Sequence, residues 1–122
     1  MRARQGRLLA AGAIALAILL AGGRLVADTP GGGVAARVAL DNDSVKVTVV
    51  TMAPGSSTGI HINAEPEMGV VVQGELTLVT RNGRQVYKPG MVVWLPPMTG
   101  HEARNESKRP VKLHAIGLKR CE

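Results

Sequence analysis

The sequence predicts one small domain built almost entirely of β-strands. Beyond residue 34 the apolar residues alternate with polar ones or form short runs, and no segment from 34 to 122 carries convincing helical periodicity. Turn-forming groups of Pro, Gly, Asn and Asp separate these runs at short intervals, as is typical of a β-sandwich or barrel. A length of 122 residues suits a single domain.

Residues 1–27 are predicted to lie outside this domain, as a cleavable signal helix. Arginines in the first seven residues precede an apolar run from 8 to 23, and residues 25–27 (LVA) offer a small residue at a cleavage point. Cleavage after Gly23 instead of Ala27 is an alternative. The run is shorter than the ~20 residues of a spanning helix, so we expect no stable membrane span after processing, and an uncleaved anchor is the less favoured alternative. A periplasmic or secreted bacterial protein is therefore expected.

The net charge of +6 comes largely from this leader. The whole chain has 15 Lys and Arg against 9 Asp and Glu, and four of those arginines lie in residues 1–27, which leaves 11 against 9. One Trp, one Tyr and no Phe provide few stacking surfaces, so no nucleic-acid binding is expected. The basic residues between 104 and 120 are interpreted as a solvated face, although a small acidic ligand would suit them.

The strands can be placed in order along the chain. Residues 28–35 are expected to form a flexible lead-in, 36–118 the β-domain and 119–122 a tail. In SVKVTVVTM (44–52), Val45, Val47 and Val49 alternate with Lys46 and Thr48, which predicts a half-buried strand. Strands are expected at 34–40, 44–52, 60–63, 68–72, 75–80, 84–87, 91–95 and 110–118.

Local patterns refine several of these elements. The apolar run 68–72 suits a strand covered on both sides. The pair Asn82-Gly83 favours a tight two-residue hairpin turn, and Gly74 and Gly90 are expected in turns with unusual backbone angles. In the last strand Val111, Leu113 and Ala115 share one face, which places His114 on the other face and outside any site.

Two stretches carry the residues on which a functional interpretation depends. The first stretch, GSSTGIHINAEPEMGVVVQG (55–74), contains a spaced motif formed by Gly55, His61, Asn63, Glu67 and Gly74. The second stretch, GMVVWLPPMTGHEARN (90–105), contains Gly90, Pro96, His101 and Asn105. Together they resemble the two motifs of the cupin family, with Asn63 where the first motif has a second His and Met98 where the second has an inner Gly.

His61, Asn63, Glu67 and His101 are the predicted metal site. Residues two apart on an extended strand face the same side, so His61 and Asn63 can share a cavity, and a turn at Pro66 can swing Glu67 toward His61. Two imidazoles and a carboxylate are the ligands of non-haem Fe(II) enzymes, and Mn(II), Ni(II), Cu(II) or Zn(II) can also accept them. Because an amide oxygen is a poorer ligand, Asn63 could instead hold a water or bind a substrate, or mark a barrel that has lost its metal.

Other residues near the motifs receive structural interpretations. Glu65 and Glu102 flank the predicted ligands out of register and are expected to be solvent-exposed. Met98 is expected either to crowd the loop before His101 or to line the pocket mouth. The single cysteine, Cys121, excludes an internal disulfide and is expected to be a free thiol at a frayed end or a link between protomers.

The cupin resemblance covers roughly residues 36–118 and implies a small antiparallel jelly-roll barrel with the site inside, commonly in a homodimer. It says little about the reaction, because fold does not decide function. One hypothesis is an exported, metal-dependent, dioxygenase-like enzyme acting on a small organic molecule, with Val72 and Trp94 shaping the cavity. The other is a non-catalytic module of the cell envelope that binds or senses a small ligand, with a degenerate metal site.

Overall fold

The computed structural model describes residues 32–120, and in that range every regular element is a strand. None of these residues belongs to a helix that could span a membrane. The expected signal helix, the first half of the lead-in (28–31) and Cys121 lie outside the described residues. The nine strands are β1 (Val34–Asp41), β2 (Val45–Met52), β3 (His61–Ile62), β4 (Glu67–Gln73), β5 (Leu76–Thr80), β6 (Gly83–Tyr87), β7 (Val92–Leu95), β8 (Gly100–Arg104) and β9 (Val111–Leu118).

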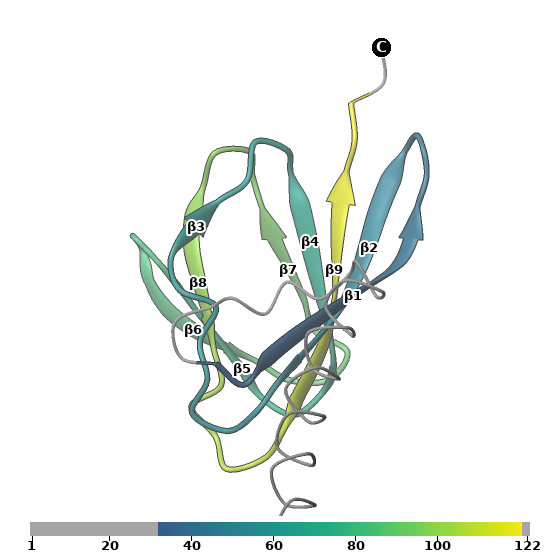
Figure 1. Ribbon diagram of the computed structural model, residues 1–122. Helices are drawn as coiled ribbons and strands as arrows, with labels where there is room; N and C mark the ends of the chain where they lie inside the picture. Colours follow the sequence, from purple (N-terminus) through teal and green to yellow (C-terminus); the bar gives the residue numbers. More distant parts are fainter. Residues whose placement is uncertain (1–31, 121–122) are drawn as a thin grey trace, which may run out of the picture.

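Two antiparallel sheets face each other. One has five strands in the order β1-β2-β9-β4-β7, and the other has four in the order β3-β8-β5-β6. Strands far apart in sequence become neighbours, as where β9 lies between β2 and β4 (Figure 1). The all-β prediction is therefore confirmed, and the arrangement is that of a small barrel.

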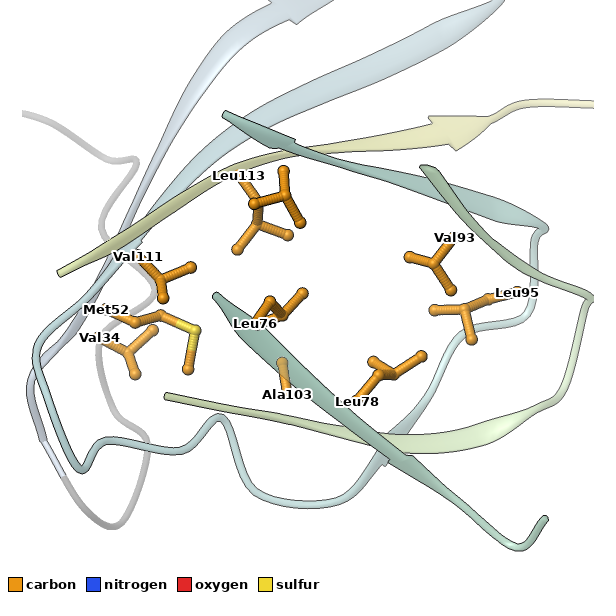
Figure 2. Packing of buried hydrophobic residues seen from close by; sticks show 10 residues of the cluster. Val34, Met52, Leu76, Leu78, Val93, Leu95, Ala103, Val111 and Leu113 are labelled. Carbon is orange, nitrogen blue, oxygen red and sulfur yellow. The ribbon is translucent and has the colours of Figure 1, made fainter. Parts of the chain in front are cut away.

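The core lies between the sheets. Alternate residues of each strand point inward, as in the neighbouring set Val50, Leu113 and Val71 from β2, β9 and β4. Figure 2 shows the buried side chains of the cluster pointing into the space between the sheets. Met52, Leu76 and Val111 are among the side chains buried most completely.

The outer face of the five-stranded sheet is unusually apolar. In β2 the inward residues are Thr48, Val50 and Met52, so Val45, Val47 and Val49 lie on the outer face. The strand is half-buried as predicted, but Val45, Val47 and Val49 face away from the barrel interior. Their outer-face neighbours on β9, β4 and β7 are also largely apolar, and include Ile116, Met68, Val70, Val92 and Trp94.

Several boundaries differ from the predictions. β1 begins at Val34, two residues before the expected start of the domain, because it pairs with the end of β2. No strand is expected between residues 95 and 110, but this segment contains β8, which lies between β3 and β5. The hairpin between β5 and β6 turns at Arg81 and Asn82, since Gly83 already pairs with Thr80.

Gly74 is fixed by packing as well as by its backbone angle. Its φ is +80°, a left-handed conformation that favours glycine. A Cβ atom at this position would lie 2.3 Å from the carbonyl oxygen of Pro110. The turn between β4 and β5 can therefore approach the start of β9 only with glycine here.

Candidate metal centre in the barrel

His61 and His101 meet across the pairing of two strands. β3 is only two residues long, and its His61 is the Cα partner of His101 on β8. Cross-strand partners project from the same face, so both imidazoles enter the barrel. Their ring centroids lie 4.1 Å apart with an interplanar angle of 63°. His101 is buried, whereas His61 is exposed at the rim.

Each imidazole is oriented by a backbone carbonyl. His61 Nδ1 lies 3.1 Å from the carbonyl oxygen of Gly59, and His101 Nδ1 lies 3.0 Å from that of Thr99. A carbonyl only accepts hydrogen bonds, so in both rings Nδ1 carries the proton. In the neutral rings Nε2 then presents a free lone pair, which is the orientation that metal-binding histidines commonly adopt.

Glu67 approaches His101 from the other sheet. It is the first residue of β4, and its Oε1 lies 3.9 Å from His101 Nε2, beyond hydrogen-bonding distance. Burial raises the pKa of the Glu67 carboxyl, and the nearby His61 partly opposes that shift. Burial also lowers the pKa of His101, which the hydrogen bond to Thr99 partly offsets. Without a metal the site thus favours a neutral imidazole beside a carboxyl that resists ionisation.

These three side chains are the only titratable groups, among residues 32–120, that line the main cavity. The cavity has a volume of about 440 Å³, within the usual range for small-molecule sites. Its remaining lining is largely aliphatic, with Val50, Leu78, Val93, Leu95 and Leu113 among the contributors. The arrangement combines an apolar chamber with one polar end.

Two residues expected to shape the cavity do not line it. Trp94 lies between the inward residues Val93 and Leu95 on β7, so alternation turns its ring to the outside, where it is 52% exposed. Val72 is likewise exposed, beside an irregularity in the pairing of β4 with β9. This prediction was wrong at both positions.

Asn63 is not brought into the main cavity. β3 ends at Ile62, so the strand alternation that would align Asn63 with His61 does not continue to it. Asn63 instead lines a second cavity of about 560 Å³, which Glu67 also borders. Its carbonyl oxygen accepts a 2.8 Å hydrogen bond from the N–H of Met98. Met98 is exposed and lines neither cavity.

The other residues near the motifs have structural roles. Glu65 is exposed as expected, but Glu102 is only 9% exposed. It accepts hydrogen bonds from Ser57 and Arg104, which hold the pKa of its carboxyl below the usual range. The expectation for Glu102 was therefore wrong, because the loop before β3 covers this part of β8. His114 lines neither cavity, as expected.

Sequence reasoning missed the residues that hold the loop before β3 in place. Thr58 donates its N–H to the carbonyl of Ala103 on β8, and its hydroxyl accepts from the Ala103 N–H. The loop is thereby attached to the residue two positions after His101, which positions the histidine pair. The only sequence signal was the run of hydroxyl residues Ser56-Ser57-Thr58, typical of turns that bond to neighbouring backbone.

The side chains of His61, His101 and Glu67 are chemically suitable ligands for a divalent transition metal. Two imidazoles with free Nε2 atoms and a nearby carboxylate are suitable ligands. Their donor atoms do not converge fully, since no group of three His, Cys, Asp or Glu side chains in residues 32–120 already forms a metal cage. The half-buried Glu67 and the exposed His61 leave side chains free to adjust at the rim.

Two antiparallel sheets packed face to face around an apolar core define the class of small jelly-roll β-barrels. The family model described as cupin domain matches residues 48–117, which is 70 of 122 residues. The chain therefore belongs to the cupin superfamily. No curated protein matches it.

Solved structures resemble this chain over most of the described residues. A cupin domain from Bordetella pertussis Tohama I is 28% identical, with a TM-score of 0.63, covering 72% of this chain and 95% of that one. The polyketide cyclase RemF from Streptomyces resistomycificus is 17% identical, with a TM-score of 0.70 and coverage of 80% and 73%. The Cupin_2 domain of an XRE family transcriptional regulator from Enterobacter cloacae is 21% identical, with a TM-score of 0.66 and coverage of 74% and 99%. The last two share the fold alone.

Proposed function

We propose that this protein is an exported cupin that binds one divalent transition metal through His61, Glu67 and His101. The observation that carries the proposal is the paired orientation of the histidines. Both Nδ1 atoms are committed to backbone carbonyls, which leaves two Nε2 lone pairs beside a carboxylate at the end of an apolar cavity. Fe(II), Mn(II), Ni(II), Cu(II) and Zn(II) are all compatible with this donor set.

We further propose a dioxygenase-like activity on a small organic molecule. A metal held by His61, Glu67 and His101 would supply Lewis-acid chemistry for a substrate and redox chemistry with dioxygen. The chain's own contribution is to hold the substrate's apolar part among the aliphatic side chains and to keep water away from it. The carbonyls of Gly59 and Thr99 orient the two imidazole rings, so that both Nε2 atoms are available to a ligand.

A non-catalytic ligand-binding module is the second candidate. The observation that favours it is the sparse chemistry of the main cavity, which has no titratable group beyond the three proposed ligands among the described residues. A ligand would then be bound for sensing or storage without turnover. This candidate predicts stabilisation by a ligand with no change in the ligand.

Elemental analysis of the protein recovered from the exported fraction, purified without a metal-affinity step, tests the proposal. We expect about one equivalent of a transition metal, and a loss of affinity of at least about tenfold in His61→Ala and His101→Ala, because even outer-shell partners of a metal contribute about 10- to 100-fold. His114→Ala is the matched control, since its imidazole lies outside both cavities. Full metal content in His101→Ala would refute the ligand assignment.

Turnover then separates the two candidates. Oxygen consumption is measured with small phenolic and keto compounds on metal-loaded protein and on His101→Ala. Consumption that follows metal content supports the enzyme. Saturable binding without consumption by protein carrying its metal supports the binding module.

A further inference from the structure

The polar cavity beside Asn63 adjoins the apolar chamber of the barrel. Thr48, Glu67 and Ala115 line both spaces. The exposed His61 and the half-buried Glu67 lie where the two spaces meet the rim, so a molecule that occupies both would pass Glu67. Because the two spaces differ in character, such a molecule needs an apolar part and a polar end.

The rim carries more positive than negative charge available to a ligand. Lys46, Lys119 and Arg120 line the second cavity. Lys119 is paired with Asp41, whereas no carboxylate of residues 32–120 lies within ion-pair distance of Lys46 or Arg120. Two carboxylates line the same cavity: Glu65, which is exposed, and Glu67, which is half-buried. Glu67 belongs to the proposed metal centre, where a divalent ion more than neutralises it.

Asn63 supplies the neutral part of this rim. Its backbone carbonyl already accepts a hydrogen bond from the Met98 N–H, and the residue lines the second cavity. An amide NH₂ donates two hydrogen bonds, which suits a carboxylate oxygen. Lysine and arginine add charge-assisted hydrogen bonds, which are stronger than neutral ones.

We propose that the barrel binds a small organic acid, with its apolar body in the main cavity and its carboxylate held at the rim by Lys46, Arg120 and Asn63. The proposal deepens the proposed function and rests on it in one respect, since a metal beside Glu67 adds to the positive charge. It assigns Asn63, which stands where the family motif has a second histidine, to ligand recognition instead of metal coordination.

Paired probes of the same shape test the charge requirement. The full chain, loaded with Mn(II), is titrated calorimetrically with benzoate against benzamide and with hexanoate against hexanamide. We expect each acid to bind at least about fivefold more tightly than its amide, because hydrogen bonds to a charged group exceed neutral ones by about 1 kcal/mol, which corresponds to about fivefold in affinity. Equal binding of acid and amide, or no saturable binding of either acid, would overturn the proposal.

The double variant Lys46→Gln, Arg120→Gln tests the assigned residues. It should lose most of the preference for acids while keeping its metal. The double variant Arg81→Gln, Lys88→Gln removes the same charge from exposed residues that line neither cavity, and should keep the preference. A preference that survives in the first double variant contradicts the assignment.

Metal content, measured on every sample, separates this inference from the metal proposal. A preference for acids that requires Lys46 and Arg120 in metal-free protein upholds the inference even if the metal proposal fails. A preference that disappears with the metal and ignores both residues means that acids bind the metal directly, which overturns the inference. Asn63→Ala should weaken acid binding with unchanged metal content; loss of metal in that variant would make Asn63 a ligand.

Discussion

The N–H of Met98 donates a 2.8 Å hydrogen bond to the carbonyl oxygen of Asn63. These are the two positions at which the chain departs from the cupin motifs, and they lie on the separate loops that lead out of β3 and into β8. The bond is between backbone groups, so it joins the loops whatever the side chains are. The two residues that differ from the motifs are thus in direct contact with each other at the rim of the barrel.

Met98 adopts the left-handed backbone that glycine prefers. Its φ is 61°, the one positive value among the described non-glycine residues, and its side chain is 66% exposed. Because a side chain there costs about 1–2 kcal/mol and packs little, Met98→Gly should stabilise the protein by up to about 1 kcal/mol. Urea unfolding measures the change. Met91→Gly, at an exposed methionine with ordinary φ, should destabilise it by about 1 kcal/mol. Equal losses in both variants would contradict the argument.

Burial of Glu67 gives the metal-free protein a specific pH dependence. The folded-state pKa of this carboxyl is raised, so the stability it contributes is present below its unfolded pKa and is lost as the pH rises through the folded pKa. Glu67→Gln removes that loss. The metal-free variant should therefore be more stable than the parent at neutral pH and equal to it once the pH falls below about 4.5, the ordinary pKa of Glu.

Thermal unfolding in a chelator, followed from neutral to acidic pH, measures this difference. Glu65→Gln is the control, because that carboxylate is exposed on the loop just before β4 and its removal should leave the stability of the fold unchanged. Addition of metal should reverse the order, since Glu67→Gln lacks an anionic ligand. A variant that gains no stability at neutral pH without metal would show that Glu67 ionises there at no cost.

The sequence predicted every strand except β8, because the alternation of apolar and polar residues is a local pattern. Val111, Leu113 and Ala115 share one face as their alternation indicated, and the structure brings the two motif histidines, His61 and His101, together as cross-strand partners. The sequence could not predict which face of β2 is buried, because both faces of that sheet are apolar. The pairing of β2 with β9 decides which face points into the barrel. Glu102 was misjudged for a similar reason, since Ser57, 45 residues earlier in the chain, covers it.

Asn105 illustrates a motif residue whose role only the contacts reveal. Its side chain is 1% exposed and donates to the carbonyls of Met52 and Arg109, while its oxygen accepts from the N–H and hydroxyl of Ser107. Asn105→Ala should cost roughly 2–3 kcal/mol, because it leaves buried polar groups without partners. Asn105→Asp should be at least as damaging, since it turns an acceptor toward two carbonyls.

Urea unfolding of both Asn105 variants tests this role. Metal content per folded molecule should stay unchanged, because Asn105 lines neither cavity. Asn82→Ala, in the exposed hairpin turn, is the control for loss of an asparagine. A metal deficit in folded Asn105→Ala would instead connect this residue to the site.

The homodimer expected from the cupin resemblance remains a prediction, and Trp94 offers its test. On the outer face of the five-stranded sheet, Trp94 is the cross-strand partner of Met68, next to Val70 and Val92. An antiparallel sheet usually has a polar solvent face, so an apolar face of this kind suits a contact with a second copy. Trp94→Glu should weaken dimerisation by at least about thirtyfold, as expected for loss of a buried tryptophan worth about 2 kcal/mol.

Sedimentation velocity over a range of concentrations measures the dimer dissociation constant, with Val86→Glu on the opposite sheet as the control. A parent that stays monomeric, or a Trp94→Glu variant as dimeric as the parent, would exclude this face as the interface.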